Sequence, residues 1–182
     1  MGKTRRKTAA RTLVCRIDHC LACKSCEIAC ALAHSDAQDL LEAVQSEPKP
    51  QSRVKVVAAG GHALPLQCRH CEDAPCLMVC PTEAIHRTGD AGPVLIDEER
   101  CIGCKMCLVV CPFGAIDLAR SGRAVVKCDL CIKRTEAGQE PACVVACPTR
   151  ALKLVDIEEY NRLRREAAAQ RIQAEAEAET RK

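Results

Sequence analysis

The sequence predicts an α+β fold in which short strands and short helices form two nested modules, followed by a C-terminal helix. Three observations lead to this prediction. Cysteine accounts for 17 of the 182 residues, whereas the chain has one Phe, one Tyr and no Trp. All but one of the cysteines fall into four groups of four. Short apolar runs flank these groups, so that a unit of strand, cysteine loop, short helix, proline turn and strand repeats along the chain.

The composition also restricts the class of protein. A domain of this length normally buries several aromatic side chains, because they contribute strongly to core energetics. With only two aromatics, the chain needs another source of stability, either disulfides or metal ligation. No stretch reaches about 18 consecutive apolar residues, as a transmembrane helix requires, and the basic N-terminus lacks the apolar run of a secretory signal. We therefore expect a cytoplasmic protein, free or peripheral to the inner face of the cytoplasmic membrane, where a reducing environment favours metal over disulfides.

The spacing within the cysteine groups indicates which metal they bind. Groups one and three have the spacing C-x2-C-x2-C-x3-C, group two has C-x2-C-x4-C-x3-C, and group four has C-x2-C-x11-C-x3-C. In chain order the groups are Cys20, Cys23, Cys26 and Cys30; Cys68, Cys71, Cys76 and Cys80; Cys101, Cys104, Cys107 and Cys111; and Cys128, Cys131, Cys143 and Cys147. Proline follows the last cysteine of groups two to four, whereas group one has Ala31 there. This is the pattern with which bacterial ferredoxins bind [4Fe–4S] clusters.

Zinc and disulfides are the alternatives to iron. Pairs of C-x2-C also form closed zinc sites that only stabilise a fold. Zinc ribbons, however, lack the third and fourth cysteines at x2 and x3, so we expect four [4Fe–4S] clusters. Cys15 is left over, and its position on one face of a predicted strand with Leu13 and Ile17 favours a small buried side chain over a redox thiol.

The fourth cysteine of each group is expected to ligate a different cluster from the first three. Groups two and three are close in sequence and would exchange their fourth cysteines, so groups one and four would pair across them. An outer module, residues 12–35 and 128–155, would then enclose an inner module, residues 68–127. The predicted ligand sets are site I (Cys20, Cys23, Cys26 and Cys147), site II (Cys128, Cys131, Cys143 and Cys30), site III (Cys68, Cys71, Cys76 and Cys111) and site IV (Cys101, Cys104, Cys107 and Cys80).

Local patterns predict the remaining elements. Apolar runs before groups one, three and four predict strands over residues 13–17, 94–96 and 124–126. The second to fourth cysteines of groups one and three predict a short helix in each. The connector between groups one and two, residues 36–67, is predicted to contain a helix over 36–45 capped by Ser35, a loop over 47–52, a strand over 53–58 and a turn at Gly60 and Gly61.

The two ends of the chain are predicted to differ. Residues 1–11 are basic and are expected to be disordered. Residues 156–182 are rich in Ala, Glu and Arg and predict a helix that frays beyond Ile172. Its stripe of Ile157, Tyr160 and Leu163 serves either to dock a partner or to pack on the adjacent module.

Charged side chains near the ligands have two interpretations. The formal net charge of +3 counts every cysteine as neutral, whereas each oxidised cluster with four thiolates would add roughly −2. Four lysines beside ligands either compensate this charge or lie on a solvated surface: Lys24, Lys105, Lys127 and Lys133. Likewise, His19 and His34 flank group one, and either tune a cluster or have no role in it. His70 would be a ligand only if the site were of the Rieske type, but group two already has four cysteines.

Three stretches carry a resemblance to a known family: CLACKSCEIACALAHS (20–35), PLQCRHCEDAPCLMVCPTEAI (65–85) and CIGCKMCLVVCPFGAI (101–116). They resemble the four-cluster ferredoxin-type electron-transfer subunits of multisubunit oxidoreductases. The resemblance is greatest to the iron–sulfur protein associated with carbon monoxide dehydrogenase. It extends to subunits of tungsten aldehyde oxidoreductase, formate hydrogenlyase and molybdenum oxidoreductases, many of them anaerobic enzymes.

The resemblance implies clusters arranged in a line and a subunit that is not an enzyme on its own. It also implies a catalytic partner, namely carbon monoxide dehydrogenase, aldehyde oxidoreductase, formate dehydrogenase or hydrogenase, together with an electron acceptor. A homo-oligomer or a larger complex would be compatible with it. The alternatives are an iron–sulfur redox sensor or structural protein, and a self-sufficient enzyme, for which the sequence offers no substrate motif. Nucleic-acid binding is not expected, because no aromatic platform accompanies the basic residues.

Overall fold

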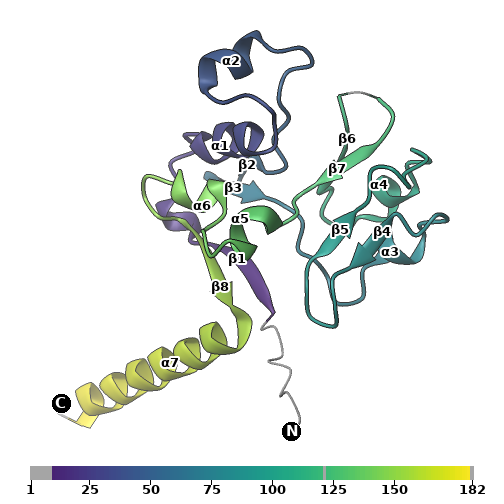
Figure 1. Ribbon diagram of the computed structural model, residues 1–182. Helices are drawn as coiled ribbons and strands as arrows, with labels where there is room; N and C mark the ends of the chain where they lie inside the picture. Colours follow the sequence, from purple (N-terminus) through teal and green to yellow (C-terminus); the bar gives the residue numbers. More distant parts are fainter. Residues whose placement is uncertain (1–9, 121, 181–182) are drawn as a thin grey trace, which may run out of the picture.

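The molecule has two lobes and a projecting helix. A computed structural model describes residues 10–120 and 122–180. One lobe is built from both ends of the chain and the other from its middle, and α7 leads away from them (Figure 1). The elements are β1 (Arg11–Cys15), a 3-10 turn (Ile17–His19), α1 (Ser25–Ala33), α2 (Leu40–Gln45), β2 (Lys55–Ala59), β3 (His62–Leu66), α3 (Pro75–Met78), β4 (Ile85–Arg87), β5 (Val94–Ile96), α4 (Met106–Val110), β6 (Ile116–Leu118), β7 (Val125–Lys127), α5 (Ile132–Glu136), α6 (Ala142–Val145), β8 (Leu152–Asp156) and α7 (Ile157–Thr180). The mixed helix and strand class predicted from the sequence is confirmed.

The strands at the two ends of the first lobe pair with each other. β1 and β8 are antiparallel, with Leu13 opposite Leu154 and Cys15 opposite Leu152. Leu13 and Leu152 are buried on the inner side of this sheet. β1 precedes cysteine group one and β8 follows group four, so the pairing brings the first and last groups together. Helices α1 and α6, which carry cysteines of these two groups, pack against each other.

The second lobe repeats the same plan on a shorter stretch of chain. β4 pairs with β5 and β6 pairs with β7, both antiparallel. Val94 of β5 and Val125 of β7 are buried between them. Helices α3 and α4 pack against each other and carry cysteines of groups two and three. The strands match the predicted apolar runs to within a residue or two.

The length of each cysteine helix follows from its two ends. Lys24 and Lys105, with φ of 60° and 66°, place a left-handed residue directly before α1 and α4. Proline after the fourth cysteine disfavours helical backbone at that cysteine, and α3, α4 and α6 all end before it. Group one has Ala31 at this position, so α1 continues beyond Cys30 to Ala33.

The connector departs from the sequence prediction. α2 starts at Leu40 rather than at residue 36, and its cap is Asp39, whose carboxylate accepts the Glu42 N–H at 2.9 Å. Ser35, predicted as the cap, instead donates its hydroxyl to the Leu32 carbonyl at the end of α1, at 2.9 Å. β2 forms a hairpin with β3, which was not predicted because Pro65 interrupts its apolar pattern.

The ends of the chain also differ from expectation. The predicted basic segment 1–11 lies mostly outside the described residues, and Arg11 already belongs to β1. α7 continues to Thr180, beyond the predicted fraying point. An ion pair of Arg162 with Glu166 at 2.8 Å and a hydrogen bond of Gln173 to Glu177 at 2.9 Å support it along one face.

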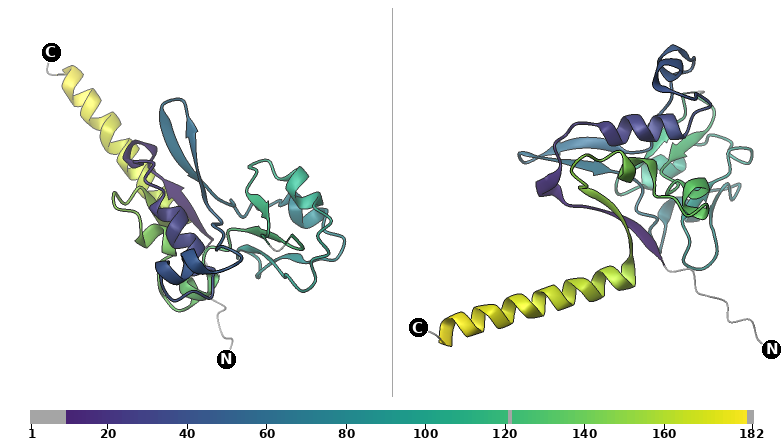
Figure 2. Two further views of the ribbon diagram at one scale, coloured as in Figure 1. Left: turned by 90° about the horizontal axis from the view of Figure 1, so that it is seen from above. Right: turned by 60° about the vertical axis from the view of Figure 1, so that its left-hand side comes forward.

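The long helix stands apart from both lobes. Figure 2 shows α7 leading away from the end of β8 in two further views. Leu163 is 49% exposed and Ile172 63% exposed, so these apolar side chains do not pack on the lobes. In the described part of the chain, no helix combines the length and apolar character needed to cross a membrane.

Each lobe has its own core, and cysteines contribute to both. The core of the first lobe contains Leu13, Cys26, Cys30, Val54, Cys128, Leu130, Cys143, Val144 and Leu152. The core of the second lobe contains Ala74, Cys76, Ile85, Val94, Cys107, Ile116 and Val125. Cysteines therefore occupy interior positions that aromatic residues fill in other domains.

In the group-three loop, the backbone at Gly103 leaves no room for a side chain. It has a φ of +68°, and a Cβ added there would lie 2.2 Å from the backbone oxygen of Arg123. Gly114 also has a positive φ, +55°, but a Cβ there would meet nothing within 4 Å. We expect Gly114→Ala to lower the free energy of unfolding by about 1 kcal/mol through backbone strain alone.

Gly103→Ala should lower the free energy of unfolding by at least about 1 kcal/mol more than Gly114→Ala, because the Arg123 backbone must also move. Denaturant unfolding of the iron-loaded proteins, followed by circular dichroism, measures the difference. Equal losses for the two variants would contradict the close approach.

Candidate iron–sulfur sites

The four cysteines of site III line one hollow of the second lobe, and the four of site IV line another. The hollows hold about 360 and 330 Å³ of space free of protein atoms, part of it open to solvent. In each hollow, three cysteines belong to one group and the fourth belongs to the other. Cys111 thus lies with group two, and Cys80 lies with group three.

The first lobe brings cysteines of groups one and four into one core. Burial, with smaller contributions from the neighbouring Cys30 and Cys131, raises the pKa of Cys143 to about 12. Cys30 thus lies among the group-four cysteines. Burial raises the pKa of Cys15, and the nearby Cys20 and Cys147 add to this rise. Cys147 and the group-one residue Cys20 therefore both lie near Cys15.

Backbone N–H groups point at the sulfur atoms of several cysteines. The donor and acceptor pairs are His70 to Cys68 at 3.4 Å, Leu130 to Cys128 at 3.4 Å, Ala115 to Cys111 at 3.4 Å and Ala151 to Cys147 at 3.2 Å. His70 and Leu130 have φ of 49° and 57°, so a left-handed residue turns each loop around its first cysteine. Hydrogen bonds of this kind stabilise a thiolate relative to a thiol.

The thiols fall into two electrostatic classes. Burial raises the pKa of Cys26 and of Cys107 to about 11, so both would remain protonated at neutral pH unless a metal displaced the proton. Burial acts in the same direction on Cys30, Cys80 and Cys147. There, however, hydrogen bonds outweigh it and lower the pKa. The buried thiols, including Cys128, whose pKa burial raises well above its usual value, therefore depend most on bound metal to ionise.

His70 tests independently whether site III fits a cluster. Its Nδ1 accepts the Val94 N–H at 3.0 Å, so the ring proton lies on Nε2. Burial, with Lys127 nearby, lowers the pKa of His70 to about 3, and the ring is neutral. Nε2 is buried and finds no hydrogen-bond partner among the described residues. An unsatisfied buried donor costs about 1–3 kcal/mol, and a cluster sulfur in the hollow that His70 lines would accept this hydrogen bond.

Lys127 is the one lysine beside the ligands that is buried. It is 3% exposed, and its ammonium donates to the carbonyls of Val94 and, at 3.0 Å, of Cys128. The other three, Lys24, Lys105 and Lys133, are exposed, in keeping with the solvated alternative. Sequence reasoning could not single out Lys127, because lysine is rarely buried and nothing in its neighbours signals it.

Residues 61–157 match the model of the 4Fe-4S dicluster domain. The chain belongs to this family. The match begins before group two and includes groups two, three and four, so it extends over the whole second lobe and part of the first.

The relatives of this dicluster protein include iron–sulfur and electron-transport proteins and a component of a reductase. An "Iron-sulfur protein" of Rhodospirillum rubrum is 48% identical over 167 residues, 85% of this chain and 87% of that protein. The electron transport protein HydN of Escherichia coli is 38% identical over 161 residues, 80% of this chain and 88% of HydN. A component of the anaerobic dimethyl sulfoxide reductase of Escherichia coli is 36% identical over 165 residues, 82% of this chain and 75% of that component. The predicted resemblance to iron–sulfur electron-transfer subunits is confirmed at this level.

Pairs of cysteine substitutions test the exchange of fourth cysteines. If Cys147 and Cys20 hold the same cluster, the Cys20→Ala/Cys147→Ala double variant loses one cluster and keeps about 12 of about 16 irons. Cys131→Ala/Cys147→Ala should lose two clusters and keep about 8, because two separate sites are broken.

Iron analysis of the anaerobically purified variants distinguishes the two results, and Cys15→Ala, outside all four sets, should retain all the iron. The exchange is refuted if the Cys131 pair loses one cluster and the Cys20 pair loses two.

Proposed function

We propose that this chain is an electron-transfer subunit that carries electrons through four [4Fe–4S] clusters between a catalytic oxidoreductase subunit and an acceptor. The observation that carries the proposal is the gathering of groups one and four in one lobe and of groups two and three in the other, where two sets of four cysteines line two hollows. When bound, [4Fe–4S] clusters supply one-electron redox chemistry at potentials that their surroundings set. The chain contributes the thiolates, the burial and the hydrogen bonds.

We infer that the two lobes are nested ferredoxin-like modules, the outer one from residues 12–35 and 128–155 and the inner one from residues 68–127. The pairing of β1 with β8 supports this, because it joins the two ends of the first lobe, and the whole second lobe lies between them in sequence. The pairing of β4 with β5 supports the inner module. On this division, residues 36–67 connect the two modules, with Val54 packed in the core of the first lobe, and α7 is an addition outside both.

The contacts between neighbouring sites support the order I, II, III, IV. Sites I and II share one core, and Cys26 adds to the rise in the pKa of Cys143 that burial begins. Sites III and IV share the other core through Cys76 and Cys107. Between the lobes, Cys68 of site III packs against the core of the first lobe.

The two ends of this order are the sites that contain an exposed cysteine. Cys23 of site I and Cys104 of site IV are exposed, whereas every cysteine of site II is buried. We infer that electrons enter and leave at sites I and IV. Apolar side chains beside these ends, such as Leu21 at 68% and Ile102 at 65% exposure, give a partner a surface to cover.

The partner that we favour is the catalytic subunit of a molybdenum, tungsten or nickel oxidoreductase. The relative from dimethyl sulfoxide reductase is by name one component of an oxidoreductase, which supports a role for this chain in an assembly. Carbon monoxide dehydrogenase, aldehyde oxidoreductase, formate dehydrogenase and hydrogenase remain the proposed choices. Each would place the chain in the cytoplasm or at the inner face of the cytoplasmic membrane.

Anaerobic affinity purification followed by a redox titration tests the function. We expect about 16 irons per chain and several reversible one-electron steps with magnetic coupling in the electron paramagnetic resonance spectra. Co-purification of a subunit with nickel, tungsten or molybdenum would identify the reaction. A chain that purifies alone with all its iron would be a diffusible carrier, still consistent with electron transfer. A single labile cluster that is destroyed by air and not reversibly reduced would overturn the proposal in favour of a sensor.

A further inference from the structure

Cys30 is held differently from the other fourth cysteines. Cys111 and Cys147 each accept the backbone N–H of the residue four positions later. In group one, α1 continues past Cys30. The backbone N–H of His34 therefore donates to the Ala31 and Leu32 carbonyls at the helix end. Cys30 Sγ is approached instead by the Arg53 N–H at 3.3 Å and by the His34 side chain, whose Nδ1 lies at 3.7 Å.

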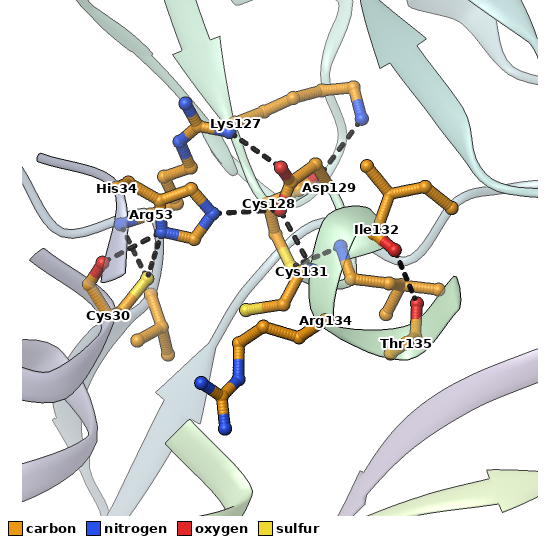
Figure 3. Close-up of polar contacts among 12 residues, drawn as sticks. Cys30, His34, Arg53, Lys127, Cys128, Asp129, Cys131, Ile132, Arg134 and Thr135 are labelled. Atoms are coloured by element: carbon orange, nitrogen blue, oxygen red, sulfur yellow. Dashed lines mark hydrogen bonds and ion pairs between the residues drawn. The ribbon is translucent and has the colours of Figure 1, made fainter. Parts of the chain in front are cut away.

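The contacts of the His34 ring define its charge. Nδ1 lies 2.7 Å from the Cys30 carbonyl oxygen, and Nε2 lies 2.9 Å from Asp129 Oδ1 (Figure 3). A carbonyl and a carboxylate only accept hydrogen bonds, so both ring nitrogens donate and the ring is an imidazolium. Burial opposes this charge, and the ion pair with the Asp129 carboxylate offsets that cost.

Asp129 connects this imidazolium to a second cation and to site II. Its Oδ2 accepts from Arg53 Nη1 at 3.0 Å, and its Oδ1 accepts the Cys131 N–H at 2.9 Å. A second carboxylate, Glu98, lies 4.0 Å from Arg53 Nη2 but is 61% exposed. Among the shielded groups, one carboxylate therefore serves two cations, which leaves a net positive charge beside the site II ligands Cys30 and Cys131.

This network is shielded from solvent. The side chains of His34, Arg53 and Asp129 are 10%, 20% and 21% exposed, so water and salt screen the charges weakly. One atom each of His34, Asp129 and Cys131 lie within 4.8 Å of one another, a spacing that could suit a metal ion. Both ring nitrogens already donate protons, however, so the geometry favours a hydrogen-bond network over a further ion site.

We propose that His34, oriented by Asp129, is a positioning residue that raises the reduction potential of the cluster at site II. This rests on the proposed electron-transfer function. Reduction adds one electron, supplied by the catalytic partner, and so adds one negative charge beside Cys30. A fixed imidazolium and its N–H near Cys30 Sγ favour that added charge. His34 carries its proton before and after the electron arrives, so no proton transfer is needed.

Redox titration of the full iron-loaded chain at one pH tests the proposal, with the site II signal identified as the one lost in Cys131→Ala. At the wild-type midpoint potential of site II, His34→Gln should lower the ratio of reduced to oxidised cluster about tenfold, equivalent to ~59 mV for one electron. His34→Lys, which keeps a cation, should recover most of that ratio. His62→Gln, at the exposed first residue of β3, should leave it unchanged.

Arg53→Gln provides a second variant in case His34→Gln fails to load iron. It removes one charge from the network while the residue 53 N–H still donates to Cys30, so the site II ratio should fall in the same direction. An unchanged site II ratio in the loaded variants, or an equal shift at all four sites, would overturn the proposal. A wild-type chain without reversible reduction would instead overturn the proposed function.

Discussion

Ligation of iron–sulfur clusters by cysteine is, on the function that we propose, the constraint from which the rest of this structure follows. If each fourth cysteine reaches a cluster in the neighbouring group, as we propose, two groups must lie face to face. The β1–β8 pairing, the contact of α1 with α6, and the contact of α3 with α4 all bring groups together in this way. The helices can then be only a few residues long, because each one merely connects a cysteine loop to a proline turn. With two aromatic residues in the whole chain, little else is available to hold these loops together.

The sequence was most informative where the determinants are local. The repeated spacing predicted the strands around groups three and four and the short helices, because a loop around a cluster, a left-handed residue and a proline all act within a few positions. It misplaced the start of α2, since Ser35 and Asp39 are both good caps and only the folded chain shows that Ser35 is used at the end of α1. It also underestimated α7, where pairs four residues apart support a helix without an apolar face.

Contacts between distant residues were beyond sequence reasoning. His34 and Asp129 are 95 positions apart, and neither has a neighbour that signals an ion pair. The lysine excess suggested compensation of cluster charge, but not that Lys127 would be the buried member. Likewise, the ring proton of His70 lies on Nε2 because the Val94 N–H, 24 positions away, donates to Nδ1. Local spacing thus predicts which residues can bind metal, whereas the fold determines the charges around them.

Those surroundings differ from one site to the next. Site II lies beside a charged histidine, and site III beside a neutral one. Ligand sets of similar chemistry can therefore hold clusters of different potential.

Hydrogen exchange of the iron-loaded and iron-free chains tests most directly whether the clusters hold the fold together. If they do, backbone amides of β1 and β8 are protected in the loaded protein and lose protection when iron and sulfide are removed, because metal binding and folding are coupled. α7 should keep part of its helix signal in both forms, since its support is local. An iron-free chain that retains full protection in the β1–β8 sheet would contradict this view and show that the apolar cores suffice.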